Sequence, residues 1–241
     1  SVTAIKHWIS AARLRTLPLA FSSILTGAAL AIAHGLFDAS VFLLCLTTTL
    51  FLQILSNYAN DLGDYLHGTD NEDRVGPQRA LQGGHITAPQ MKAAVIFLAI
   101  ISLISGIALL YQSRLRLDAK GLFFLILGLL AIIAAIKYTA GKNPYGYAGL
   151  GDLSVFLFFG LIGVLGSYYL HGLELPYSLD VFAASAIGFF STAVLNLNNM
   201  RDAVPDHAAN KMTMAVRLGK KNARIYHMLI ISLGGLCLLI Y

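Results

Sequence analysis

The chain has little charge and very little cysteine. Only 12% of its 241 residues are charged, whereas 57% are hydrophobic, and the mean hydropathy is +0.70. A composition this apolar excludes an ordinary soluble domain and indicates an integral membrane protein. The two cysteines, Cys45 and Cys237, lie far apart within long apolar runs and are interpreted as apolar filler. The seven histidines are scattered and no Cys/His zinc spacing occurs, so the sequence predicts no zinc site.

Charge is nearly absent from seven apolar runs that approach or reach the length of a membrane span. A bilayer core about 30 Å thick requires roughly 20 apolar residues in a helix. The runs lie near residues 17–33, 41–59, 92–111, 121–139, 152–170, 181–199 and 225–241. They predict an all-α, multi-span transmembrane helical bundle. Residues 1–16 lack a signal-peptide cleavage site and are expected to form an interfacial helix that leads into the first span.

Positive charges are distributed unevenly between the two ends of the predicted spans. Fourteen of the 17 Lys and Arg residues fall on the side that holds the N-terminus, whereas Arg114, Arg116 and Lys120 fall in one loop on the other side. Because positively charged loops remain in the cytoplasm, we expect the N-terminus to face it. Eight of the 12 acidic residues share that side. The net charge of +5 is therefore interpreted as a signal of membrane orientation, not of nucleic-acid binding.

Two acidic clusters follow the second and the sixth predicted spans. Their candidate metal ligands are Asn60, Asp64, Asp70, Asn198, Asp202 and Asp206. Each cluster contains Asn-x-x-x-Asp, a spacing that stacks two oxygen ligands on one face of a helix. Hard cations such as Mg²⁺ prefer these oxygens and commonly bridge protein carboxylates to substrate phosphates. The two clusters together predict a metal-dependent site for a diphosphate.

The alternative interpretation of each cluster is ordinary capping, because polar residues at helix ends usually cap the helix or face solvent. Two clusters with one spacing on one side of the membrane argue against that alternative. Gly63 and Gly68 are expected to loosen the first helix, so that Asp70 reaches back from a turn. Pro205 is expected to place Asp206 on a loop.

The order of elements repeats along the chain. In each half an apolar helix ends in Asn-Asp or Asn-Asn, and a polar segment rich in Gly, Asp and Arg leads to the next span. This order predicts a single membrane domain, residues 1–241, built from two related halves of about 1–120 and 121–241 with the acidic clusters across a pseudo-symmetric cavity. The last apolar run stops at Tyr241 without a charged flank, so we expect the domain to be incomplete at its C-terminal end.

Two stretches resemble the paired aspartate motifs of the UbiA superfamily of intramembrane prenyltransferases. They are the first acidic cluster, which ends in Gly68-x-Asp70, and Asp202-x-x-x-Asp206. Further stretches are similar to the branch that prenylates 1,4-dihydroxy-2-naphthoate for menaquinone biosynthesis; they are residues 11–18, 70–74, 149–153 with 158–160, 198–202 and 211–219. Most of the superfamily has an acid where Gly68 stands, and the naphthoate branch resembles the longer spacing to Asp70. Either Asp61 or Asp70 would complete the first motif. The family fold implies about nine spans around a central cavity that opens to the cytoplasmic side.

The resemblance implies transfer of a polyprenyl group from polyprenyl diphosphate to 1,4-dihydroxy-2-naphthoate, with loss of diphosphate and CO₂. It implies two Mg²⁺ ions held by the ligands of the two acidic clusters, of which Asp64 and Asp202 are also catalytic candidates. The candidates for the diphosphate oxygens, each of which could instead be an orientation charge, are Arg74, Arg79, Lys142 and Lys211. Tyr138 precedes Lys142 in a Tyr-x-x-x-Lys element similar to the family's. Tyr138 and Asp152 are the catalytic candidates at the acceptor, and Asp152 is equally placed to cap the helix that starts there.

Two other functions remain open. A related prenyltransferase that acts on 4-hydroxybenzoate or another aromatic acceptor would use the same aspartates, and the spacing to Asp70 argues against it. A divalent-cation transporter would carry ionisable residues near the middle of its spans, where this chain has almost none. Menaquinone biosynthesis implies a bacterial cytoplasmic membrane with the active site facing the cytoplasm.

Overall fold

The computed structural model describes residues 2–70 and 79–241, and this part of the chain is helical and holds no β-strand. Residues 2–137 contain α1 (Val2–Ala12), the short 3-10 helix η1 (Leu14–Thr16), α2 (Leu17–Ala33), α3 (Ala39–Leu66), α4 (Ala88–Gln112) and α5 (Ala119–Lys137). Residues 151–240 contain α6 (Gly151–Val155), the π-helical segment η2 (Phe156–Gly166), α7 (Ser167–Gly172), α8 (Asp180–Arg201), α9 (Ala203–Ala208) and α10 (Met214–Ile240).

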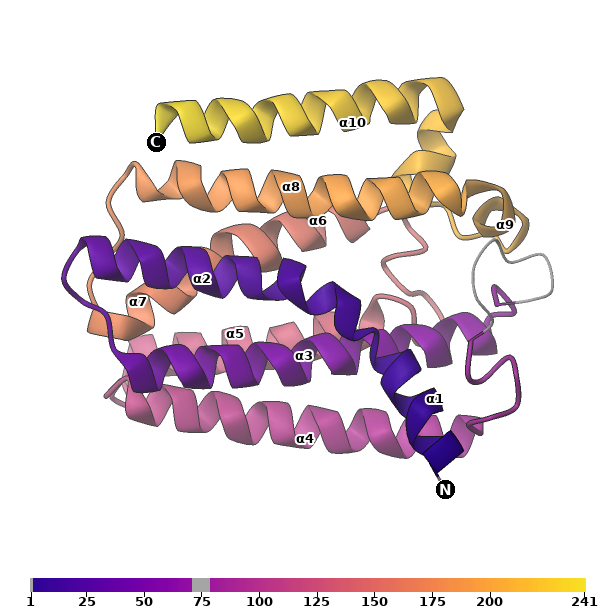
Figure 1. Ribbon diagram of the computed structural model, residues 1–241, viewed down its shortest axis with the longest axis horizontal. Helices are drawn as coiled ribbons and strands as arrows, with labels where there is room; N and C mark the ends of the chain where they lie inside the picture. The colour runs from indigo at the N-terminus through magenta and orange to yellow at the C-terminus, as the bar shows by residue number, and fades with distance from the viewer. Residues whose placement is uncertain (1, 71–78) are drawn as a thin grey trace.

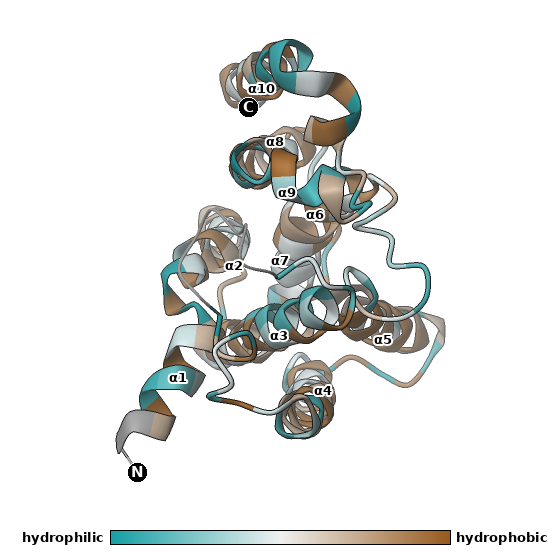
Figure 2. Ribbon diagram, turned by 90° about the vertical axis from the view of Figure 1, so that its right-hand side faces the viewer, coloured by the Kyte–Doolittle hydropathy of each residue, from teal (hydrophilic) through white to brown (hydrophobic). Residues whose placement is uncertain are grey.

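Seven helices of the described chain are long and apolar enough to cross a membrane, which confirms the predicted all-α, multi-span class. The segments α6, η2 and α7 together make one of these spans, Gly151–Gly172. The long helices run side by side along one axis (Figure 1), and the end view shows α3 between α2, α4 and α5, with α8 between α10 and the α6 to α7 span (Figure 2). The predicted N-terminal helix is α1, which leads through η1 into α2.

Polar side chains fix where several spans begin. Asp38 caps α3, since its Oδ1 accepts hydrogen bonds from the backbone N–H groups of Ser40 and Val41 at 2.8 and 3.0 Å. Asp118 caps α5 in the same way. Thr87 and Gln90 form a reciprocal capping box at the start of α4. These caps satisfy N–H groups that have no partner within the helix, so each span starts at a defined residue.

The end of α3 differs in part from the sequence prediction. The helix continues through Gly63 to Leu66, so Gly63 does not loosen it. Instead, Gly63 allows close packing, because a Cβ atom there would collide with the backbone and side chain of Thr139 beyond α5. Gly68, with φ +71°, follows the helix end in the left-handed conformation that glycine tolerates. Asp70 then lies on a turn, with its N–H 3.4 Å from the Asp64 carbonyl oxygen, as predicted.

The second cluster lies where α8 ends. Asp202 lies between α8 and α9, and Asp206 lies within the short helix α9 and not on a loop, which corrects the prediction. Pro205 is in the first turn of α9, where a missing N–H costs no intrahelical bond. Gly219, with φ 72° and ψ 167°, interrupts α10, so its regular membrane-spanning part follows that residue.

Candidate functional site

Arg79 gathers the acidic residues at the end of α3. Its Nη1 contacts Asp61 and lies 3.6 Å from Asp64 Oδ2, and its Nε lies 3.2 Å from Asp70 Oδ2. Burial acts to lower the pKa of Arg79, but the carboxylates of Asp61, Asp64 and Asp70 outweigh it and hold the pKa above its ordinary value. Arg79 therefore remains a cation among three carboxylates.

Asp61, which the sequence offers only as an alternative to Asp70 as a ligand, is also a member of this cluster. Its side chain is 2% exposed and accepts hydrogen bonds from Arg79 and from Arg13, which lies at the junction of α1 and η1. Arg13 adopts a left-handed conformation, φ 49°, that a non-glycine residue rarely adopts. The signal that could have identified Asp61 is its position three residues before Asp64, on the same helix face.

Lys211 brings the two acidic clusters together. Its Nζ lies 3.2 Å from Asp64 Oδ1 in the first cluster and 4.0 Å from Asp206 Oδ1 in the second. These two carboxylates belong to segments 142 residues apart in the chain. The two clusters therefore lie beside each other at one end of the bundle, the end on the right of Figure 1.

Tyr147, in the connection between α5 and α6, also contacts this site. Its hydroxyl donates a hydrogen bond to Asp64 Oδ1 at 2.8 Å and lies 2.6 Å from Thr69 Oγ1. Lys211 Nζ lies 5.2 Å from the centre of its ring. Burial, followed by the charge of Asp64, raises the pKa of Tyr147, so the phenol stays protonated at neutral pH. Sequence reasoning missed Tyr147, because an interfacial tyrosine is common and carries no motif.

The other predicted ligands lie around this cluster with different partners. Asp202 is paired with the adjacent Arg201, at 2.6 and 2.7 Å, and is about one quarter exposed. The Asn60 side-chain oxygen accepts a hydrogen bond from Thr139 Oγ1 at 3.1 Å. Asn198 is exposed, and so is Lys142 among the predicted diphosphate ligands. Arg74 lies outside the described residues.

The two predicted acceptor residues are neighbours. The side chain of Tyr138 packs against Gly151, next to Asp152. Asp152 is buried, and its Oδ2 accepts a hydrogen bond from the hydroxyl of Tyr226 in α10 at 2.8 Å. Burial raises the pKa of Tyr138, and the charges of Asp152, Tyr145, Asp64 and Asp206 raise it further. Tyr138 is therefore within electrostatic range of both Asp152 and the acidic clusters.

The donor chemistry of the site fits a hard divalent cation. Asp64, Asp70 and Asp206 offer only oxygen, and the ammonium group of Lys211 lies between Asp64 and Asp206. Within residues 2–70 and 79–241, no three His, Cys, Asp or Glu side chains form a ready coordination group. Mg²⁺ is usually bound by one or two carboxylates together with substrate phosphates, so an incomplete protein ligand set suits it.

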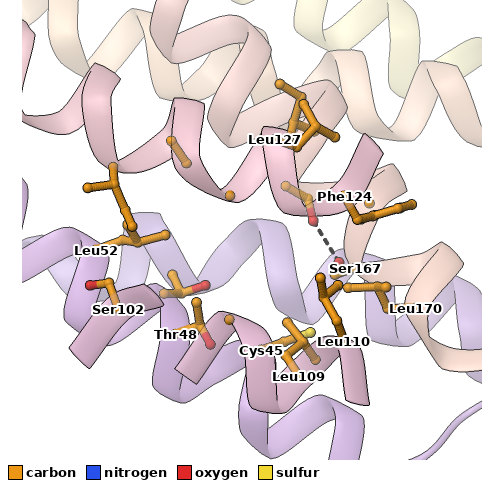
Figure 3. Close-up of a pocket in the computed structure, with 18 of the residues that line it drawn as sticks. Cys45, Thr48, Leu52, Ser102, Leu109, Leu110, Phe124, Leu127, Ser167 and Leu170 are labelled. Carbon is orange, nitrogen blue, oxygen red and sulfur yellow. Dashed lines mark hydrogen bonds between the residues drawn. The ribbon is translucent and has the colours of Figure 1, made fainter. Parts of the chain in front are cut away.

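An apolar cavity of about 180 Å³ lies deeper in the bundle, between α3, α4, α5 and the η2 to α7 segment. Figure 3 shows Thr48 and Leu52 from α3, Ser102 from α4 and Leu127 from α5 around it. Thr49, which also lines the cavity, precedes Asn60 by eleven residues, as Leu127 precedes Tyr138. Eleven residues make about three helical turns, so the cavity lies beneath the faces that carry Asn60 and Tyr138.

Comparison with known proteins identifies the relatives of the chain. Residues 20–241 match the model of the UbiA prenyltransferase family. The chain is 47% identical, over 100% of its length and 77% of the relative's, to 1,4-dihydroxy-2-naphthoate octaprenyltransferase of Escherichia coli (strain K12). Proteins of the same name from Haemophilus influenzae and Mycobacterium tuberculosis are 46% and 38% identical over 98% and 97% of the chain, and 77% of each relative. The chain therefore belongs to the UbiA prenyltransferase family.

Proposed function

We propose that the protein transfers a polyprenyl group from polyprenyl diphosphate to 1,4-dihydroxy-2-naphthoate, releasing diphosphate and CO₂ in menaquinone biosynthesis. The observation that carries this proposal is that Asp64 and Asp206 both lie near Lys211, above an apolar cavity. The chain in which they do so is 47% identical to the 1,4-dihydroxy-2-naphthoate octaprenyltransferase of Escherichia coli. The excess of Lys and Arg at this end supports a cytoplasmic active site in a bacterial inner membrane.

The diphosphate would bind at the end of the bundle where the carboxylates meet. UbiA family members generally use a divalent metal ion. Mg²⁺ bound by Asp64, Asp70, Asp202 and Asp206, with Asn60 and Asn198 assisting, would neutralise the diphosphate and stabilise it as a leaving group. Arg79 would offer two donors to the phosphate oxygens and Lys211 a single ammonium charge, and both stand beside the carboxylates. Arg74 and Lys142 remain candidates for the same role.

The isoprenoid tail would extend into the apolar cavity. The lining of the cavity is almost entirely carbon, which suits a hydrocarbon chain. The faces of α3 and α5 that line the cavity also carry Asn60 and Tyr138, about three helical turns from the lining residues Thr49 and Leu127. A tail anchored at the carboxylates would therefore run along α3 and α5 into the membrane interior. A dry, apolar lining also protects the allylic cation from capture by water.

Tyr138 and Asp152 would act on the acceptor. When the carbon–oxygen bond of the prenyl diphosphate breaks, its electron pair leaves with the diphosphate and the allylic carbon becomes cationic. A ring carbon of the dihydroxynaphthoate forms the new carbon–carbon bond, and its carboxylate leaves as CO₂. Asp152, whose Oδ2 accepts a hydrogen bond from the hydroxyl of Tyr226, would accept the naphthol proton or orient the acceptor. The protonated Tyr138 would donate a hydrogen bond to the acceptor.

An assay of the purified chain tests this function. The protein is incubated with octaprenyl diphosphate and 1,4-dihydroxy-2-naphthoate, with Mg²⁺ or with a chelator, and prenylated naphthoquinol, diphosphate and CO₂ are measured. Mg²⁺-dependent formation of all three is the expected result. Turnover with 4-hydroxybenzoate alone would retain the aspartate chemistry and overturn the proposed acceptor. Absence of turnover with every aromatic acceptor would overturn the proposed function.

A further inference from the structure

We propose that Tyr147 is a positioning residue that orients the Asp64 carboxylate for the divalent cation and fixes the position of the two acidic clusters relative to each other. This inference rests on the proposed function. Tyr147 belongs to neither cluster, because it lies in the connection between α5 and α6. Three different segments of the chain nevertheless meet at its side chain and backbone, namely the end of α3, its own connection and the connection between α9 and α10.

The hydroxyl of Tyr147 fixes one oxygen of Asp64. It donates to Asp64 Oδ1 at 2.8 Å, and since a phenol has one hydrogen, the hydroxyl of Thr69 must donate to Tyr147 across their 2.6 Å contact. Thr69 is 5% exposed and Asp64 is 3% exposed, so water does not readily replace either bond. A carboxylate held at one oxygen in this way presents its other oxygen in a defined direction. Such outer partners of metal ligands typically contribute 10- to 100-fold to metal affinity or activity.

The ring of Tyr147 extends the same control to the second cluster. Lys211 Nζ lies 5.2 Å from the ring centre, within the range of a cation–π contact, and also 4.0 Å from Asp206 Oδ1. The Tyr147 carbonyl oxygen accepts a hydrogen bond from the Met212 N–H at 3.0 Å, which anchors the segment that carries Lys211. Tyr147 thus contacts Asp64 through its hydroxyl and contacts Lys211, the ion-pair partner of Asp206, through its ring.

Tyr147→Phe separates these two contributions, because it deletes the hydroxyl and keeps the ring. Tyr145→Phe is the matched control: Tyr145 lies in the same connection, and its hydroxyl bonds to the Ala134 carbonyl oxygen at 2.7 Å and to Ser154 Oγ at 3.1 Å, not to a carboxylate. Mn²⁺ binding to the purified full chain is measured by calorimetry with inorganic diphosphate present and no acceptor. The apparent melting temperature of each variant is measured in parallel.

The expected result is a 10- to 100-fold rise in the Mn²⁺ dissociation constant of Tyr147→Phe, an unchanged constant in Tyr145→Phe, and similar melting temperatures in the two variants. In turnover, Tyr147→Phe should recover at raised Mg²⁺ concentration. Equal dissociation constants in Tyr147→Phe and wild type, or equal losses in both variants, would overturn the inference. If the wild type binds Mn²⁺ but transfers no prenyl group, the proposed function fails, while the comparison of dissociation constants still decides the role of Tyr147.

Discussion

Replacing Asp61 by alanine is expected to destabilise the protein by about 3 kcal/mol. The Asp61 side chain is 2% exposed and is the shared partner of Arg13 and Arg79, whose side chains are 23% and 12% exposed. Breaking a buried ion pair by removing one partner costs about 3–5 kcal/mol, because a charge is left without compensation. The lower end of that range applies here, since Arg13 can turn toward solvent and Arg79 retains Asp64 and Asp70.

The assay is the apparent melting temperature of the purified protein. For a chain of this size, 1 kcal/mol corresponds to about 2–4 °C, so Asp61→Ala should melt about 6–12 °C below the wild type. Asp202→Ala is the control, because Asp202 also pairs with an arginine but at the surface, where an ion pair contributes about 0–1 kcal/mol. Equal, small losses in the two variants would refute the reasoning that Asp61 compensates two partly buried cations.

Three further predictions concern catalysis. Asp64→Ala and Asp202→Ala should each abolish prenyl transfer while the protein remains folded in the membrane, and retained activity in either purified variant would rule out their shared role at the metal. Gly128 lines the cavity and has open space at its Cβ position. Gly128→Phe should therefore lower kcat/KM for octaprenyl diphosphate by about tenfold or more relative to a short prenyl diphosphate. Gly235 also has open space at its Cβ position but does not line the cavity, so Gly235→Phe should leave that ratio unchanged. Because burial raises the pKa of Tyr138 above its ordinary value of 10.0, Tyr138→Phe should lower the rate without changing the shape of the pH–rate profile between about pH 6 and 9, and a shifted alkaline limb would contradict that assignment.

The sequence predicted the membrane spans well because hydropathy is a local property. All seven runs correspond to helices, and the main differences lie at their ends. The predicted run near 225–241, for example, belongs to a helix that begins at Met214 and is interrupted at Gly219. Gly63 illustrates a limit of local reasoning, because its tight packing against Thr139 involves a residue 76 positions away. From the low helix propensity of glycine alone, Gly63 was expected to loosen the helix.

The candidate site was predictable only in part, for a similar reason. Asp64 follows from the repeated Asn-x-x-x-Asp spacing and Asp206 from the resemblance to the paired aspartate motifs, and both lie near Lys211. Asp61 and Tyr147 become members of the site through contacts with residues far away in the sequence, Arg13 and Asp64 respectively. The spacing of Asp61 to Asp64 places both on one helix face, but no spacing encodes the contact of Asp61 with Arg13 or of Tyr147 with Asp64. These contacts require the packing of α3 against α1 and the course of the connection between α5 and α6.

The charges of the described site also bear on how many metal ions it would need. Asp61, Asp64, Asp70 and Asp206 supply four negative charges, and Arg13, Arg79 and Lys211 supply three positive charges, so the described part of the cluster carries one excess negative charge. A diphosphate ester brings about three more into a poorly solvated place, where uncompensated charge is costly. One divalent cation would leave the assembly strongly negative, whereas two balance it, as in other two-metal sites that stabilise a leaving group. Arg79 and Lys211 would then turn from the carboxylates toward the phosphate oxygens. The cations that keep the carboxylates paired before the substrate arrives are therefore the ones best placed to receive it.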